Sequence, residues 1–348
     1  MRRRTRTTLL SAFALAFALA GASADAAMYC VNNTSELRNA LADADGNGVD
    51  DTIRLAQGTF NITQSSLQTF VQDGEDLLIE GGWLSVFGPC NMLTNDASLS
   101  VLDGLGERPV LRIVGGSGLA DISVRNLSIR NGKRLAGTDT AGLTIWTDFE
   151  HTGAVTIERV IFSGNSSDTD AAALYISARA DITVRNSVFT GNHAVATAAM
   201  LLSTPNAHSI FLVNNTVAFN VASQAGYGWA AVGFVYGTPF LSNNIFYYNT
   251  SGSQKDFTAN SDDILIANDI QHLTGTPSPL SIDNLALEPD FADPISMRLA
   301  STSPLLNVGT AAAIGGVGTV DIKGDARVVG GIDLGAHELD QFFRDGFE

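Results

Sequence analysis

The sequence predicts an all-β chain that folds as a right-handed parallel β-helix (a β-solenoid), in which successive coils of the backbone stack on one another. Three observations support this prediction. Between residues 117 and 270 a strand-and-turn unit recurs at intervals of 27 to 33 residues. No helical periodicity occurs inside the units, and their apolar residues alternate with polar ones, as in strands with one buried face. Such a period is typical of solenoids, and parallel strands joined by crossovers take the right-handed sense.

The repeat unit consists of an alternating strand, a polar corner and a shorter apolar run. Copies lie at 121–131, 155–165, 181–192, 210–220 and 240–249. Their alignment places one set of residues at the same corner, namely Asn126, Arg159, Asn186, Asn215 and Asn244. Asparagine tolerates the left-handed backbone of tight turns, and its amide can bond the equivalent residue of the next coil. We therefore predict a structural ladder of Asn126, Asn186, Asn215 and Asn244, beside an inner column of Phe162, Phe189 and Phe246.

A second strand recurs at 142–146, 173–177, 199–203 and 232–236. Because side chains alternate between the two faces of a strand, we assign one set to the core: Leu143, Ile145, Leu174, Ile176, Met200, Leu202 and Val235. The other face carries aromatic side chains that could bind sugar rings or a protein partner: Trp146, Tyr175, Phe234 and Tyr236, with Tyr227 and Trp229 nearby. The alternatives are that loops cover these rings, or that the assignment is shifted by one residue.

The first 26 residues have the order of a secretory signal peptide. Basic residues at 2–6 precede an apolar stretch at 9–19 and small residues at 22–26. That stretch is shorter than the roughly 20 residues that span a bilayer, and no later stretch is long enough. We therefore expect an exported protein that is secreted, periplasmic or on the cell surface, with no transmembrane segment after the signal is removed.

The remaining chain divides into four parts. We assign an N-terminal cap and first coils to 27–115, repeat coils to 116–275, C-terminal coils and a closing segment to 276–338, and a tail to 339–348. A short helix that begins near Thr34 or Ser35, with Leu37, Ala40 and Leu41 on its apolar side, is expected to cap the first coil. The Gly-rich C-terminal part is expected to close the other end of the solenoid.

Charge limits the partners of this protein. The chain has 20 basic and 36 acidic residues, and removal of residues 1–26 takes away four basic residues and one acidic residue. The remainder, 16 basic and 35 acidic residues, carries a net charge of −19. Such a surface repels the phosphates of nucleic acid, which we exclude as a partner. It also disfavours anionic polysaccharides unless a local basic groove or a bound cation intervenes.

Two further features concern covalent and metal bonds. Cys30 and Cys90 are the only cysteines, and export favours a disulfide between them. Asp43, Asp45, Asn47 and Asp51 place oxygen atoms around Gly48 as in the first part of a calcium-binding loop. Arg54 stands where such a loop ends in glutamate, and the alternative is a solvated acidic turn. Calcium is the only cofactor that the sequence suggests.

Catalysis of polysaccharide cleavage would require paired carboxylates, or a base beside a cation. The candidates are Asp168 and Asp170 before one strand, and Asp148 and Glu150 one coil earlier. Lys133, Arg134, Arg159 and Arg185 are the nearby cations. Nothing in their spacing brings these groups together, and the alternative is that the carboxylates are solvated turn residues.

Several motifs resemble those of bacterial β-helix proteins with polymorphic-outer-membrane-protein-like repeats. Residues 162–165 and 189–192 match the F-x-x-N motif of that family, and 172–174 is an Ala-substituted form of its G-G-A-[IL] motif. The ends of the chain are similar to "choice-of-anchor Q" domain proteins, most clearly at 321–327 and 331–338, where His337 replaces the usual tyrosine. The resemblance implies a β-helix fold and export, and it implies no defined activity. The last residues, D-G-F-E, resemble a sorting tail of exported proteins.

These features favour an exported, non-catalytic β-helix that acts as an adhesin-like or carbohydrate-binding scaffold, with a polysaccharide or a surface protein as its partner. The first alternative is a polysaccharide lyase or glycoside hydrolase that acts on the outer face of the solenoid. The second alternative is a purely structural envelope protein.

Overall fold

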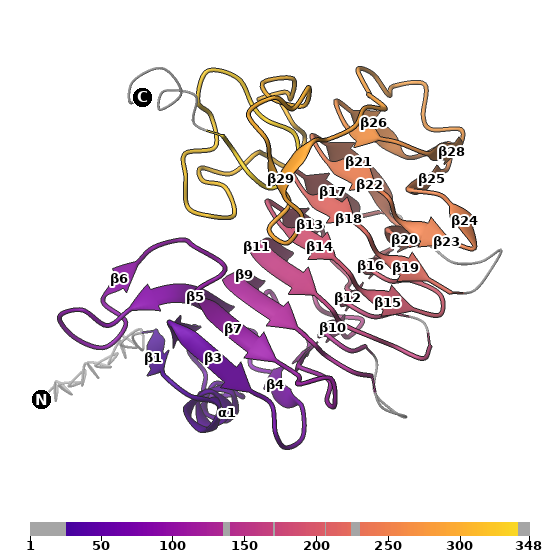
Figure 1. Cartoon of the computed structure of the whole chain (residues 1–348). Helices are drawn as coiled ribbons and strands as arrows, with labels where there is room; N and C mark the ends of the chain where they lie inside the picture. The colour runs from indigo at the N-terminus through magenta and orange to yellow at the C-terminus, as the bar shows by residue number, and fades with distance from the viewer. Residues whose placement is uncertain (1–25, 135–139, 170, 206, 224–229, 340–348) are drawn as a thin grey trace, which may run out of the picture.

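The computed structural model describes residues 26–134, 140–169, 171–205, 207–223 and 230–339. These residues form a right-handed parallel β-helix, as predicted, with coils that stack from the N-terminal to the C-terminal end (Figure 1). Within the described ranges no helix has the length and apolar character needed to span a bilayer. All but the last residue of the predicted signal peptide and all but the first residue of the predicted tail lie outside the described residues.

One sheet of 16 strands forms two adjoining sides of the solenoid, and we call it the large sheet. Its first side contains β1 (Ala27–Val31), β2 (Asp51–Ala56), β5 (Leu77–Leu84), β9 (Ile122–Arg130), β11 (Val155–Ser163), β13 (Ile182–Arg185), β17 (Ser209–Val213), β21 (Thr238–Ser242) and β26 (Ile264–Ile266). Beyond a corner, the sheet continues through β3 (Gly58–Asn61), β7 (Ser100–Asp103), β14 (Val188–Thr190), β18 (Thr216–Ala218), β22 (Ile245–Tyr247) and β27 (Asp269–Ile270), and β6 (Met92–Leu93) pairs with β5.

A second sheet of six strands lies across the core, and we call it the small sheet. It contains β4 (Leu67–Val71), β8 (Leu111–Gly115), β10 (Leu143–Thr147), β12 (Leu174–Ser177), β16 (Met200–Ser203) and β20 (Val232–Val235). Shorter pairings join β15 (His193–Ala194), β19 (Val221–Ala222), β23 (Thr250–Ser251) and β24 (Ser253–Gln254), then β25 (Phe257–Ala259) with β28 (Leu273–Gly275), and β29 (Phe291–Asp293) with β30 (Arg298–Leu299).

The core consists of like residues stacked on like residues, because the parallel strands are in register. Ile122 pairs with Val155, Val155 with Ile182, and Ile182 with Ile210, and all four side chains are fully buried. The predicted phenylalanine column is present. The rings of Phe162 and Phe189 stack at 4.7 Å, and Val217 separates Phe189 from Phe246 in the same column.

The predicted asparagine ladder is wrong by one residue in two of its four members. Asn215 and Asn244 lie inside the corner, where Asn244 Oδ1 accepts from Asn215 N at 2.9 Å and from Asn215 Nδ2 at 3.0 Å. Ser187 N donates to Asn215 Oδ1 at 3.1 Å, and the ladder continues from Asn244 to Asn268 and Asn284. Because Asn214 and Asn243 precede Asn215 and Asn244, the sequence alone left the register of these doublets open.

Asn126 and Asn186 belong to an outer column that turns the corner itself. Its members all have a left-handed backbone, with φ between +50° and +59°: Asn126, Arg159, Asn186, Asn214 and Asn243. Asn214 Nδ2 donates to Asn186 Oδ1 at 3.1 Å, and Asn243 Nδ2 to Asn214 Oδ1 at 2.9 Å. In each asparagine doublet the first residue therefore forms the turn and the second belongs to the interior ladder, whereas the apolar residues Leu127 and Val160 follow Asn126 and Arg159.

A second interior ladder runs through the asparagines of the F-x-x-N motifs. Asn165 N donates to Asn192 Oδ1 at 3.0 Å, Asn192 N to Asn220 Oδ1 at 3.1 Å, and Asn220 N to Asn249 Oδ1 at 3.2 Å. The ladder ends on the buried carboxylate of Asp256, which accepts from Asn249 N at 2.7 Å. The motif is therefore explained by hydrogen bonds that every coil needs.

The N-terminal end is capped by a helix and fixed by a disulfide, as predicted. Helix α1 (Thr34–Asp43) buries Leu37, Ala40 and Leu41 against the first coils. Its N-cap is Asn33, one residue before the predicted start, and Asn33 accepts from Glu36 N. The Cys30–Cys90 disulfide joins β1 to the loop between β5 and β6.

The C-terminal part was expected to close the far end of the solenoid. Most of it instead lies elsewhere. After a last partial coil at 282–285, residues 305–338 run back along the outside of the large sheet, and we call them the C-terminal strap. Val317 O accepts from the side chains of Asn186 and Asn214, and Lys323 reaches Asp96 near the N-terminal coils at 2.6 Å. The polar outer column offers amide groups to a backbone that glycines allow to approach closely.

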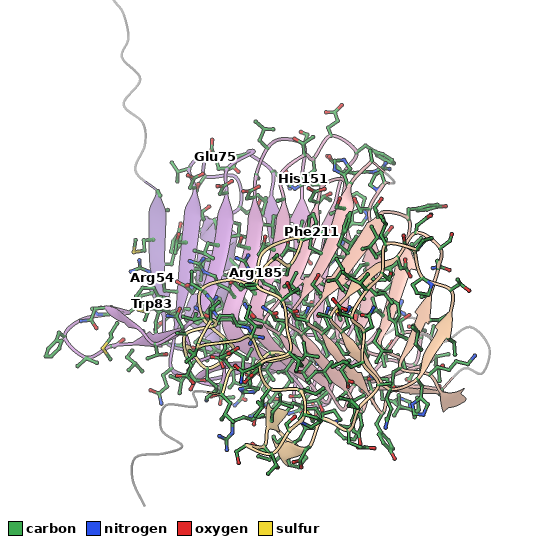
Figure 2. The ribbon with its side chains drawn as sticks, turned by 90° about the horizontal axis from the view of Figure 1, so that it is seen from above. Arg54, Glu75, Trp83, His151, Arg185 and Phe211 are labelled. Carbon is green, nitrogen blue, oxygen red and sulfur yellow. A yellow bond between two sulfur atoms is a disulfide. The ribbon has the colours of Figure 1, made fainter. Side chains whose placement is uncertain are left out.

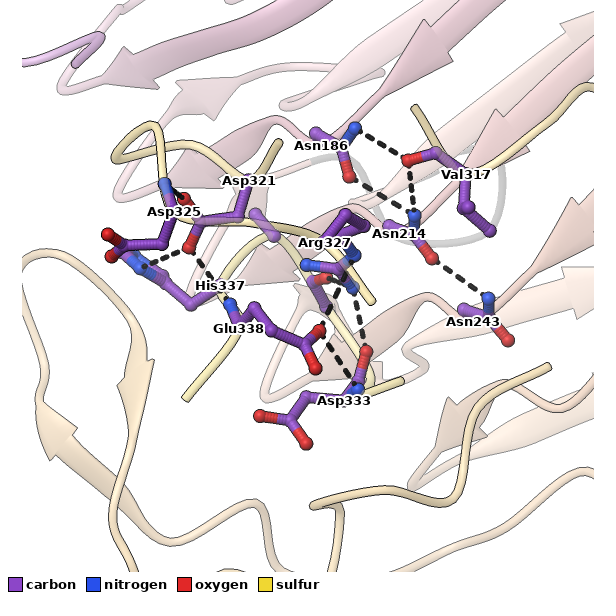
Figure 3. A network of polar contacts seen from close by, with 12 residues as sticks. Asn186, Asn214, Asn243, Val317, Asp321, Asp325, Arg327, Asp333, His337 and Glu338 are labelled. Atoms are coloured by element: carbon purple, nitrogen blue, oxygen red, sulfur yellow. Dashed lines mark hydrogen bonds and ion pairs between the residues drawn. The ribbon is translucent and has the colours of Figure 1, made fainter. Parts of the chain in front are cut away.

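A buried polar network within the strap fixes its conformation (Figure 3). The guanidinium of Arg327 is fully buried, and its Nη2 donates to Asp333 O at 2.7 Å and to Gly335 O at 2.6 Å. Glu338 Oε2 lies 3.7 Å from Arg327 Nε, and Asp321 Oδ2 accepts from Glu338 N at 2.9 Å. The end motifs at 321–327 and 331–338 therefore fasten the strap to itself.

The buried groups of the strap make the stability of the fold depend on pH. Burial raises the pKa of Glu338 to about 8, although Arg327 opposes the shift. The protonated form is favoured in the fold, so this contribution to stability is complete below the unfolded pKa and is lost as pH rises through about 8. Burial lowers the pKa of His337, so that ring stays neutral in the same range.

We expect the free energy of unfolding to fall by about 1 kcal/mol between about pH 7 and pH 9 in denaturant titrations. In Glu338→Gln this decline should be smaller, because the variant removes the titrating group. An equal decline in both proteins would contradict the assignment.

Candidate functional site

The first side of the large sheet has an outward face that carries two columns of polar and aromatic side chains. The first column is built from residues that pair in register: Ser123, Thr156, Thr183, Phe211 and Phe240. All five side chains are partly exposed, and the rings of Phe211 and Phe240 stack at 5.6 Å. Three hydroxyl groups and an aromatic platform thus lie in one line along the solenoid axis, and we call this line the hydroxyl–aromatic track.

The second column alternates in charge. Its members on successive strands are Arg54, Glu80, Arg125, Glu158 and Arg185. Arg125 Nε donates to Glu80 Oε1 at 2.7 Å, and Arg185 Nε to Glu158 Oε1 at 3.0 Å. Opposite charges on neighbouring strands stabilise a sheet, so this column has a structural role of its own.

Arg159 joins this column from the corner. Its Nη1 donates to Glu158 Oε1 at 2.6 Å and its Nε donates to Asn126 Oδ1. Burial lowers the pKa of Arg159, and the charge of Glu158 opposes that shift. Four arginines and two glutamates give this part of the face a charge of +2 within a strongly acidic protein. It is the local basic surface that the overall composition did not predict.

The charged column has an aromatic ring at its N-terminal end. The guanidinium of Arg54 lies 4.0 Å from the ring centre of Trp83, and Trp83 Nε1 donates to Glu80 Oε2 at 3.1 Å. Figure 2 shows Arg54 and Trp83 at this end, with Arg185 and Phe211 farther along the solenoid, beside the strap.

The strap forms a wall beside the other end of the track. Gly315 lies against Phe211, where an added Cβ would come within 2.7 Å of the Phe211 side chain. Gly318 lies against the corner, where a Cβ would meet Asn186 Nδ2 at 2.7 Å and Glu158 Oε1 at 3.2 Å. Both glycines have positive φ, which larger residues rarely adopt. The strap therefore lies in direct contact with the face.

This arrangement favours binding of an extended polar chain. Hydroxyl and guanidinium groups bond sugar hydroxyls, and exposed rings stack on the apolar faces of sugars. The two glutamates are nearly covered, with side chains 4% and 7% exposed, and both are bonded to arginine. They are therefore held as structural partners of the arginines.

The structure does not bring the predicted catalytic carboxylates together. Asp148 and Glu150 follow β10, whereas Asp168 precedes β12. The first two residues therefore lie at the C-terminal ends of the strands of the small sheet, and Asp168 lies at the N-terminal ends. A strand of five residues is about 16 Å long, which exceeds the separation of carboxylates in glycosidases. Asp148 Oδ1 accepts from Glu150 N in a local turn. Asp170 lies outside the described residues.

The predicted aromatic surface is only partly present on the small sheet. Trp146 is 40% exposed, Tyr236 is 69% exposed and Tyr175 is partly exposed. Phe234 was wrongly assigned, because it pairs with Leu202 and packs against the core, while Val235 faces outward. The register differs by one residue from the predicted alignment because Gly233, not Phe234, pairs with Leu201. Tyr227 and Trp229 lie outside the described residues.

The predicted calcium ligands form a hydrogen-bonded turn. Asn47 Nδ2 donates to Asp51 Oδ1 at 2.8 Å, and Asn47 Oδ1 accepts from Val49 N at 2.9 Å. Burial raises the pKa of Asp51 to about 6, and burial also raises the pKa of Asp45. Asp43 lies at the end of α1. Across the described ranges, no three His, Cys, Asp or Glu side chains are arranged to hold a metal ion. Calcium binding stays a prediction.

The two columns were not predicted from the sequence, although a signal was present. The residue before each corner alternates between Arg125, Glu158 and Arg185, and of these only Arg185 was considered, as a nearby cation. Arg54, Glu80 and Trp83 lie in early coils whose sequences do not repeat clearly, so their register could not be derived.

Comparisons with known proteins found two solved structures with weak similarity to this chain. No family model matches the chain, and no curated protein matches it. A pectin methylesterase from Aspergillus niger is 12% identical, with 78% of this chain and 94% of that chain covered at a TM-score of 0.32. Pectate lyase Pel9A is 14% identical, with 91% and 97% covered at a TM-score of 0.33. Likeness at this level carries no argument about fold or activity.

The charged column predicts a large effect of one substitution. Glu158→Ala should lower the free energy of unfolding by about 3–5 kcal/mol, because it leaves the buried guanidinium of Arg159 without its carboxylate. Glu150→Ala, at an exposed turn, is the matched control and should change stability by less than about 0.5 kcal/mol. Chemical denaturation measures both, and similar values for the two variants would contradict the role of the column.

Proposed function

We propose that this protein is an exported, non-catalytic β-helix that binds a polysaccharide chain along the outward face of its large sheet. In this proposal it serves as a secreted or surface scaffold. The observation that carries the proposal is the hydroxyl–aromatic track, in which three hydroxyl residues and two stacked phenylalanines are aligned along the axis. A linear ligand is matched by a linear array of equivalent positions on a solenoid.

The non-catalytic part of the proposal is supported by the state of the carboxylates on this face. Glu80 and Glu158 are nearly covered and bonded to arginine side chains, so neither is placed to protonate a leaving group. The end motifs that resemble choice-of-anchor Q proteins support the assignment of the chain to exported β-helix proteins.

The test is retardation of the purified protein in gels that contain neutral or acidic polysaccharides. Phe240→Ala removes one of the two rings of the aromatic platform and should weaken retention by at least about tenfold. Leu201→Ala is the matched control, because Leu201 is a partly exposed apolar residue at an outward position of the small sheet. Circular dichroism confirms that both variants are folded.

Two outcomes would contradict this proposal. Equal retention of Phe240→Ala and the unchanged protein would remove the track as the binding surface. Release of reducing ends or unsaturated sugars from any polysaccharide in the panel would remove the non-catalytic assignment.

A further inference from the structure

A hairpin arm projects from the N-terminal end of the solenoid and carries exposed apolar side chains. The arm is the hairpin at 84–93, which consists of the last residue of β5, the connecting loop and β6, and it extends past β1 in two views of the molecule (Figures 1 and 2). Phe87 is 93% exposed, Val86 51% and Met92 44%. Exposed apolar side chains gathered at one place on an exported protein indicate a contact surface.

The arm is held in a defined position. Trp83 and Leu84 pair with Leu93 and Met92 as an antiparallel ladder, and the disulfide of Cys90 with Cys30 ties the arm to β1. Within the loop, Asn91 Oδ1 accepts from Val86 N at 3.0 Å, and Ser85 Oγ accepts from Cys90 N at 3.1 Å. The apolar tip is therefore presented by a fixed element, which lowers the entropy cost of binding.

The strand beside the arm ends the large sheet. Among the described residues, β1 pairs with β2 alone. Ala27 N donates to Asp50 O at 2.7 Å, so the backbone groups of Ala27 face β2, and those of Met28 and Cys30 face away from it. The strand has the sequence AMYCV, with neither a charged residue nor a proline. Edge strands of soluble proteins usually carry such protection against pairing.

We propose that two copies of this chain associate end to end through β1. Antiparallel pairing about a twofold axis at Tyr29 would bond Met28 of each copy to Cys30 of the other and would join the two large sheets. In each copy the arm follows the C-terminal end of β5, which runs parallel to β1. Antiparallel pairing of the two β1 strands therefore places one arm at each end of the pair. Each Phe87 then packs on the other copy.

A second copy is favoured over an isolated peptide for two reasons. A single added peptide strand would pair with the edge of β1, but it would leave the arm uncovered because the arm extends beyond that strand. A second solenoid lies along the same axis and can cover the arm as well. The uncharged strand also pairs with its own copy without like charges in contact. The net charge of −19 on each copy opposes the association, so salt should strengthen it.

The experiment is sedimentation velocity of the exported, purified protein over a range of concentrations at low and high salt. We expect a monomer–dimer equilibrium that shifts toward dimer as salt is added. Met28→Lys places a charge on the free edge, at a side chain that is 60% exposed, and should weaken dimerisation by at least about tenfold. Phe87→Ser should weaken it independently, because it removes the tip of the arm.

Phe149→Ser is the matched control, because Phe149 is 78% exposed and lies far along the chain in the turn after β10. It should leave the dimer unchanged. A monomer at every concentration and salt condition would overturn the proposal, and so would a dimer that both test variants leave intact. A dimer that Phe149→Ser alone disrupts would assign the contact to the turn after β10 and would also overturn the proposal. Thermal unfolding shows that each variant is folded.

Discussion

The constraint on which this structure depends is the hydrogen bonding of buried backbone at the corners of the coils. A corner interrupts the sheet, so its N–H groups lose their strand partners inside a dry core, where an unpaired donor is costly. This chain solves the problem with side-chain amides. Each interior asparagine accepts from the backbone N–H of the preceding coil and donates its own Nδ2 to a carbonyl or to the next amide. The coils are thus joined at their corners as well as along their strands.

The same corner structure determines which side chains line the outer surface of the molecule. One residue per corner adopts a left-handed backbone and points outward, which creates the polar column on which the C-terminal strap lies. Because the strands on either side of the corner stay in register, outward residues on successive coils also align. Thr156 therefore stacks on Thr183 and Phe211 on Phe240, and a surface able to bind a linear ligand arises without any dedicated loop.

Repetition explains what could be predicted from the sequence. The period, the alternating strands and the signal-like start were sufficient for the fold class, the cap helix and the disulfide. The register within Asn214–Asn215 and Asn243–Asn244 was not determined, because either residue of each pair could occupy the interior. Phe234 was misassigned for a similar reason, since a glycine precedes it and a one-residue shift exchanges the two faces. The strap and the arm involve contacts between distant, non-repeating segments, for which the sequence has no periodic signal.

Hydrogen exchange of individual backbone amides tests the central claim most directly. The N–H groups of Asn165, Asn192 and Asn220 donate to no strand carbonyl and donate only to asparagine side chains of the next coil. If these ladders hold the coils together, the three amides exchange as slowly as those in the buried strands and open with them as one unit. Exchange as fast as that of an exposed turn, such as the one at Ile295, would show that the ladders are incidental to the fold.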